Sequence, residues 1–147
     1  MDEKNQGTAT KNVAKQIFVN LPVEDLDKSI AFFAKLGFTF NPEFTDKNAT
    51  CMIIGENIFA MLLVMPFFKG FTKKEIPDAA KATEVIMAIS VDSRSKPDEV
   101  AEKAIAAGAK GPYPPSDYGW MYSRSFLDLD GHMWEIFYMD ESKKPKE

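Results

Sequence analysis

The chain has 147 residues, enough for one domain with a sizeable core and too few for two ordinary domains. Hydrophobic residues make up 45% of it and charged residues 27%, values typical of a globular protein, which excludes global disorder. The formal net charge is -4 and the basic residues are dispersed, so we expect no basic face that would bind nucleic acid or an anionic membrane.

The first half of the chain predicts a strand, a helix and then further strands. Residues 1–14 are polar and without period, which is typical of a disordered tail. Alternation over residues 16–23 predicts a strand. Asp25 then supplies a helix N-cap, and Gly37 stands where a left-handed C-cap residue belongs. Three β-rich runs complete this half, over residues 38–44, 50–54 and 58–65.

The second half repeats this order after a linker. The linker, residues 66–83, carries an aromatic patch and is expected to form one helical turn near residues 73–76. A strand over residues 84–91 and a helix from Pro97 to Gly108 follow. Two last strands, 121–128 and 133–139, meet in a tight turn at Asp130-Gly131, and residues 142–147 form a polar tail. The repetition indicates duplication of one structural unit, with the helices on one side and the opposite sheet faces enclosing a cleft.

Cysteine and histidine usage limits the chemistry further. The one cysteine, Cys51, excludes an intrachain disulfide and fits a reducing compartment. No apolar run reaches the roughly 18 residues that span a bilayer, and the N-terminus lacks the apolar stretch of a signal peptide. We therefore expect a soluble cytoplasmic protein without a membrane partner. The one histidine, His132, lies in an apparent turn and is predicted to be solvated.

Two motifs resemble those of a known superfamily. They are FVNLPVEDLDKSIAFFAKLGF, which begins at Phe18, and FLDLDGHMWEI, which begins at Phe126. Both look like the vicinal oxygen chelate superfamily, which includes glyoxalase I, bleomycin-resistance proteins and extradiol dioxygenases. The likeness extends over residues 16–140 to a bacterial branch described as predicted lactoylglutathione lyase. It implies an α+β domain, residues 15–141, in which paired β-α-β-β-β modules (15–65 and 84–141) form a curved, partly closed sheet around a cleft. It also implies a homodimer.

The resemblance further implies a metal site with four ligand positions. Those positions carry Phe18, Ile86, a residue at or beside Leu62, and Glu135. Only Glu135 has a donor atom, and apolar side chains do not ligate a divalent cation. We therefore expect no cofactor, with a divalent metal doubtful and Glu135 as the one matching ligand position.

The last hairpin supplies the remaining candidate residues. With Asp130-Gly131 in a two-residue turn, Phe126 lies opposite Glu135 and Arg124 is its diagonal neighbour. Arg124 would hold an anionic group and Glu135 would act as a base toward a carbon acid. The alternative is a structural Arg–Glu pair. Asn20 and Tyr122 are expected to line the same cavity. The alternative for Asn20 is a hydrogen bond to the backbone, and the alternative for Tyr122 is to anchor a loop or a dimer contact.

Two functions follow from these residues. The first is a glyoxalase-like protein with a small-molecule cleft that works as a metal-independent lyase or isomerase through Glu135. The alternative is a non-catalytic, ligand-sequestering protein resembling the bleomycin-resistance proteins. In both, the partners are a small-molecule ligand and a second copy of the chain.

Overall fold

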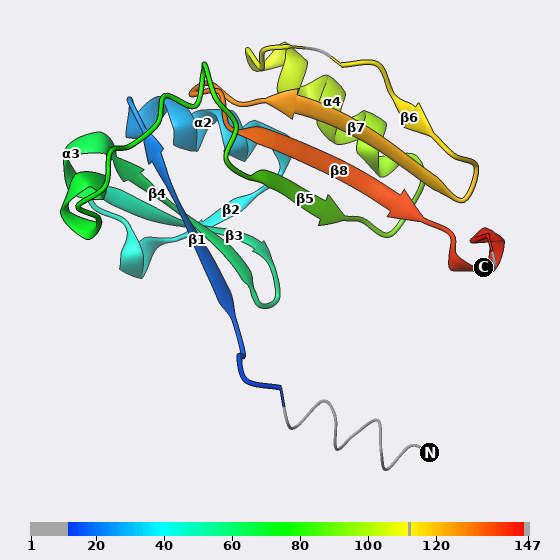
Figure 1. Ribbon diagram of the computed structural model, residues 1–147, viewed down its shortest axis with the longest axis horizontal. Helices are drawn as coiled ribbons and strands as arrows, with labels where there is room; N and C mark the ends of the chain where they lie inside the picture. The colour runs from blue at the N-terminus through cyan, green and yellow to red at the C-terminus, as the bar shows by residue number, and fades with distance from the viewer. Residues whose placement is uncertain (1–11, 112, 146–147) are drawn as a thin grey trace.

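The computed structural model describes residues 12–111 and 113–145. Most of the expected N-terminal tail, residues 1–14, therefore lies outside the described residues (Figure 1). At the other end, the predicted polar tail begins within a short 3-10 helix, Glu141–Lys143. None of the described helices is long and apolar enough to cross a membrane.

The strands form two four-stranded sheets of the same topology. The first sheet has the order β1 (Ile17–Val23), β4 (Ile58–Val64), β3 (Ala49–Gly55), β2 (Thr39–Asn41). The second has the order β5 (Ile86–Ser90), β8 (Met133–Met139), β7 (Met121–Leu127), β6 (Ser116–Asp117). In each sheet the first strand pairs in parallel with the last strand of its module, and the other pairs are antiparallel. The predicted α+β architecture of paired modules is confirmed, and the two sheets are not closed into one.

One helix follows the first strand of each module. In α2 (Leu26–Leu36), the Asp25 carboxylate accepts a hydrogen bond from the backbone N–H of Lys28 at 3.1 Å, and Gly37 ends the helix at a φ of 106°. In α4 (Lys96–Ala106), Pro97 lies in the first turn, as predicted. The two helices pack against each other and against the sheets on one side of the molecule (Figure 1).

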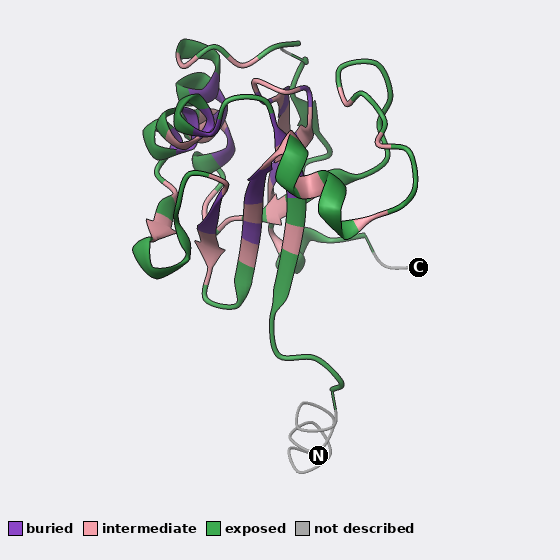
Figure 2. Ribbon diagram, turned by 90° about the vertical axis from the view of Figure 1, so that its left-hand side faces the viewer, coloured by how far each residue is buried: buried purple, intermediate pink, exposed green. Residues whose placement is uncertain are grey.

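The core lies between these helices and the sheets (Figure 2). Phe33 of α2 packs edge-on against Trp134 of β8, with ring centroids 5.2 Å apart. Phe32, also of α2, packs against Phe126 of β7 at 6.4 Å. The helix of the first module thus contacts the sheet of the second, so the two modules share one core and hold a fixed relative position.

The linker and one short strand, β2, differ from the sequence predictions. The strand predicted over residues 38–44 ends at Asn41, because Pro42 begins a 3-10 helix, Pro42–Phe44. The helical turn predicted near residues 73–76 is wrong. Helix α3 (Met65–Phe68) and a 3-10 helix, Lys69–Phe71, form earlier instead. Pro66 in the first turn of α3 was the local signal for that start.

Candidate functional site

The β7–β8 hairpin has a three-residue loop rather than the predicted two-residue turn. The backbone N–H of Asp128 donates to the carbonyl of His132 at 2.9 Å, which leaves three residues in the loop, and Gly131 takes a φ of 95°. Ser125 therefore lies opposite Glu135. Because a one-residue change of register turns every side chain to the other face, the predicted placement of Arg124 and Phe126 beside Glu135 is wrong.

Arg124 instead faces the helices and binds α4. Its guanidinium donates to the carboxylates of Asp98 at 2.8 Å and Glu102 at 2.9 Å. The hydroxyl of Tyr122 also donates to Asp98, at 2.6 Å. This bond and the one from Arg124 lower the pKa of Asp98. Arg124 does form carboxylate pairs, but with α4 rather than with Glu135, and these contacts join β7 to the helix. Phe126 is a core residue, 1% exposed.

Glu135 lies on the sheet face that points away from the helices. Its neighbours across the strands are Ala88 of β5 and Ser125 of β7, and Met133 and Phe137 share its face along β8. The side chain is half-buried. The structure therefore keeps Glu135 available on an open, largely apolar surface, without the predicted arginine.

The residues at the implied metal position do not fit a divalent cation. Phe18 stacks on Phe59 with ring centroids 4.7 Å apart, on the face away from the helices. Leu62 points into the core, so Met61 shares the open face with Phe18. Ile86 occupies the matching place in β5. Within residues 12–111 and 113–145, no three potential ligands cluster together. Of the four implied ligand positions only Glu135 offers a donor atom, which is too few to hold a divalent cation.

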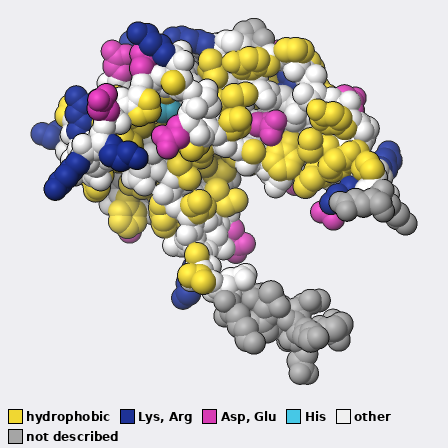
Figure 3. Space-filling model, viewed as in Figure 1, with side chains coloured by type: hydrophobic (Ala, Val, Ile, Leu, Met, Phe, Trp, Pro, Cys, Tyr) yellow, Lys and Arg dark blue, Asp and Glu magenta, His cyan; other side chains and the backbone are white. Residues whose placement is uncertain are grey.

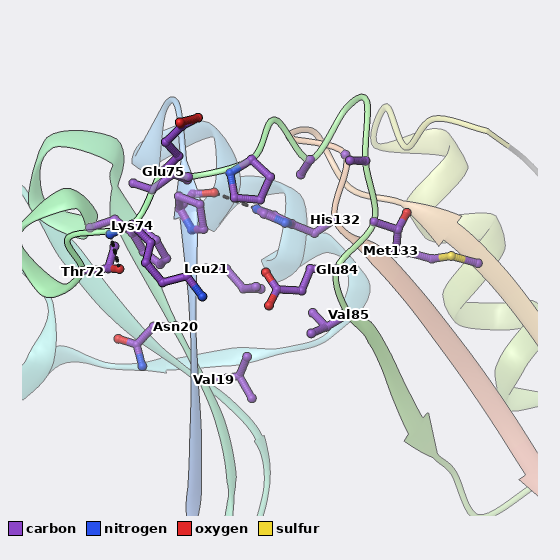
Figure 4. Close-up of a pocket in the computed structure, with 18 residues that line it drawn as sticks. Val19, Asn20, Leu21, Thr72, Lys74, Glu75, Glu84, Val85, His132 and Met133 are labelled. Atoms are coloured by element: carbon purple, nitrogen blue, oxygen red, sulfur yellow. Dashed lines mark hydrogen bonds between the residues drawn. The ribbon is translucent and has the colours of Figure 1, made fainter.

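A cavity of about 360 Å³ lies between the modules (Figure 4). Strand β1, the linker, the segment that leads into β5, the β7–β8 loop and the first residue of β8 line it. Its apolar side chains are Val19, Leu21, Pro22, Phe68, Ile76, Pro77, Val85 and Met133, and its polar ones include Asn20, Thr72, Lys74, Glu75, Glu84 and His132. The carboxylate of Glu75 is directed away from Lys74 and Glu84 (Figure 4). Among the predicted site residues only Asn20 lines this cavity, and its amide also donates to the carbonyl of Phe18 at 3.2 Å.

His132 lines the cavity and is not the solvated turn residue that the sequence predicted. Its ring is half-buried, and Nε2 lies 2.7 Å from the carbonyl oxygen of Pro22 in β1. A carbonyl only accepts, so Nε2 carries the proton of this bond. Asp130 reaches the same region, where its carboxylate accepts from the backbone N–H of Glu24 at 2.8 Å. The loop of the second module thus holds the β1–α2 junction of the first.

The aromatic patch of the linker divides between the cavity and the surface. Phe68 lines the cavity. Phe67 and Phe71 pack edge-on against each other at 5.2 Å and remain 40% and 68% exposed. Cys51 is buried, and burial raises the pKa of its thiol, as expected of an unreactive cysteine.

Known proteins share this architecture. Residues 15–55 match the family model "Bleomycin resistance protein-like N-terminal". A hypothetical protein from S. aureus is 26% identical, with a TM-score of 0.72 over 88% of this chain and 98% of that one. A glyoxalase/bleomycin resistance protein/dioxygenase from Nocardioides is 23% identical, with a TM-score of 0.64 over 100% and 99% of the two chains. The chain has the glyoxalase/bleomycin-resistance fold.

A third match concerns a ligand complex. A bleomycin-binding protein solved with bleomycin is 19% identical and covers 85% of this chain and 98% of that one, with a TM-score of 0.55. No curated protein matches the chain significantly. These matches support the superfamily that the two motifs suggest, whereas the lactoylglutathione lyase-like branch remains a prediction.

Proposed function

We propose that this protein binds an organic small molecule in the cavity between its modules and sequesters it without chemical change. The cavity itself carries the proposal. Its volume of about 360 Å³ falls within the roughly 300–1,000 Å³ of small-molecule sites. Its walls are mainly apolar, with a few polar groups to orient a ligand, which is the usual make-up of such sites.

A neutral fluorescent probe, N-phenyl-1-naphthylamine, tests the proposal by calorimetric titration. We expect one-to-one binding to the parent protein. Ala82→Phe places a ring into the cavity lining and should weaken binding about tenfold or more, which corresponds to about 1.4 kcal/mol. Lys81→Phe adds the same ring next to the cavity, at an exposed position that does not line it, and is the matched control. Equal affinities of the two variants would reject the proposal.

A second candidate is a metal-independent lyase or isomerase. The observation that favours it is the position of Glu135, two residues beyond the cavity-lining Met133 on the same face of β8. A carboxylate on a half-buried apolar surface is suited to remove a proton from a carbon acid. If this reading is right, Glu135→Gln abolishes turnover of a substrate while leaving its affinity unchanged. Retained turnover in that variant would exclude it.

We also propose that the protein forms a homodimer and is located in the cytosol. Large apolar side chains remain exposed on the sheet faces away from the helices: Phe18 (46%), Ile86 (54%) and Met139 (37%). Figure 3 shows hydrophobic side chains gathered over β5 and β8. Light scattering should give twice the chain mass, reduced to a monomer by Phe18→Ser with Ile86→Ser but not by Val13→Ser at an exposed site outside the sheets. The free thiol of Cys51 is consistent with a reducing cytosol.

A further inference from the structure

Two oppositely charged side chains point into the cavity from the linker and the segment that leads into β5. Figure 4 shows the ammonium of Lys74 and the carboxylate of Glu84 directed toward one another across the space above β1. Among residues 12–111 and 113–145, neither group has an oppositely charged side chain within 4 Å, so the two do not form a salt bridge with each other. Both charges are therefore free to pair with a bound molecule.

The backbone around Lys74 is held in place. Its N–H donates to the hydroxyl of Thr72 at 3.1 Å, which forms a tight local turn after the 3-10 helix. On the other side, Glu84 comes two residues before β5, so the second sheet fixes its position. These contacts constrain the backbone from which the two charged side chains extend, and both side chains are exposed in the free protein.

Apolar walls surround the charged pair. The same cavity is lined by apolar side chains from both modules and the linker: Val19 and Leu21 of β1, Phe68 of α3, Ile76 of the linker, Val85 just before β5, and Met133 of β8. A ligand that fills it needs an apolar body to contact these side chains. A ligand with one charge would leave the opposite protein charge partly desolvated and unpaired, which costs affinity.

We propose that the cavity takes a small zwitterion of the amino-acid type, with one carboxylate, one amine and an apolar substituent. Lys74 binds the carboxylate, Glu84 binds the amine, and the apolar walls hold the substituent. The inference rests on the proposed function, because it names the ligand class of the same cavity.

Four compounds with one common ring separate this inference from the proposed function. They are phenylalanine (both charges), 2-phenylethylamine (amine alone), 3-phenylpropionate (carboxylate alone) and 2-phenylethanol (neutral), each titrated by calorimetry. We expect phenylalanine to bind about tenfold or more tightly than either singly charged analogue, because charge-assisted hydrogen bonds are the strong ones. An analogue that binds as tightly as phenylalanine overturns the inference.

Charge-removing variants test the two assigned residues. Lys74→Met and Glu84→Gln should each weaken phenylalanine binding about tenfold and leave 2-phenylethanol binding unchanged. Lys73→Met and Glu56→Gln remove the same charges at exposed positions outside the cavity and should change neither affinity. If phenylalanine binding survives both cavity variants, the inference is wrong. If 2-phenylethanol binds without any gain for phenylalanine, only the inference fails. If no compound binds the parent protein, the proposed function fails with it.

Discussion

The carboxylate of Asp128 accepts a hydrogen bond from the indole Nε1 of Trp134 at 2.9 Å, and both side chains are almost fully buried. Its other oxygen accepts from the backbone N–H groups of Asp130 and His132, each at 3.0 Å. This one side chain therefore holds the three-residue hairpin loop and fixes it to the core. Burial nevertheless raises the pKa of Asp128, because the charged form has lost its water.

The raised pKa of Asp128 predicts a stability that falls as the pH rises. Between the ordinary pKa of an aspartate, about 3.9, and the raised value, the folded protein binds more protons than the unfolded chain. The free energy of unfolding therefore decreases with pH across that interval. Asp128→Asn removes this titration. We expect the stability of the parent relative to the variant to decline in urea unfolding as the pH rises above about 4, and a constant difference would contradict the assignment.

Asp98 predicts the opposite pH dependence. Its pKa is lowered by the hydrogen bonds from Tyr122 and Arg124, so its stabilising contribution is present above the ordinary pKa and is lost as the pH falls through the lowered one. The side chain is half exposed, so solvent screening limits the effect to about 1 kcal/mol or less. The difference between the parent and Asp98→Asn should shrink below about pH 4. Glu99→Gln, on the same helix and outside the salt bridges of the described residues, is the matched control for the loss of one carboxylate.

Two separate features require glycine at position 131: its positive φ angle and the closeness of the linker backbone. An added Cβ would lie 2.8 Å from the backbone of Ala80. Gly119 has a comparable φ of 82° with nothing within 4 Å of the same position. We expect Gly119→Ala to cost on the order of 1–2 kcal/mol through left-handed strain alone. Gly131→Ala should cost clearly more, measured by urea unfolding. Equal costs would mean that the linker moves aside freely.

Local signals in the sequence were sufficient for most elements. Asp25 and Gly37 delimit α2 through contacts within a few residues, so their roles can be inferred without the fold. The same holds for strands whose alternation covers five or more residues. The 3-10 helix at Pro42 and the helix at Pro66 show the limit, because proline is compatible with strand ends, linkers and helix starts alike.

The candidate site depended on facts that the local sequence does not contain. An Asp-Gly pair occurs in two-residue and three-residue hairpin loops, and the choice decides which face Arg124 occupies. The contact between His132 and Pro22 joins residues 110 positions apart, and nothing near either residue signals it. Lys74 and Glu84 line one cavity because the linker runs between the two modules. The family motifs predicted the fold, whereas long-range contacts determine which residues line the cavity.

The final prediction tests the hairpin register directly through energetic coupling. Arg124 and Glu135 lie on opposite faces of the second sheet, whereas Arg124 and Asp98 are in contact at 2.8 Å. In double-mutant cycles, Arg124→Met with Glu135→Gln should therefore be additive within about 0.5 kcal/mol. Arg124→Met with Asp98→Asn should show a coupling of about 0.5 kcal/mol or more, because each single change removes the same interaction. The measurement is the free energy of unfolding in urea at neutral pH. A larger coupling to Glu135 than to Asp98 would mean that the loop has two residues, that Arg124 faces the open surface, and that the two residues form one site after all.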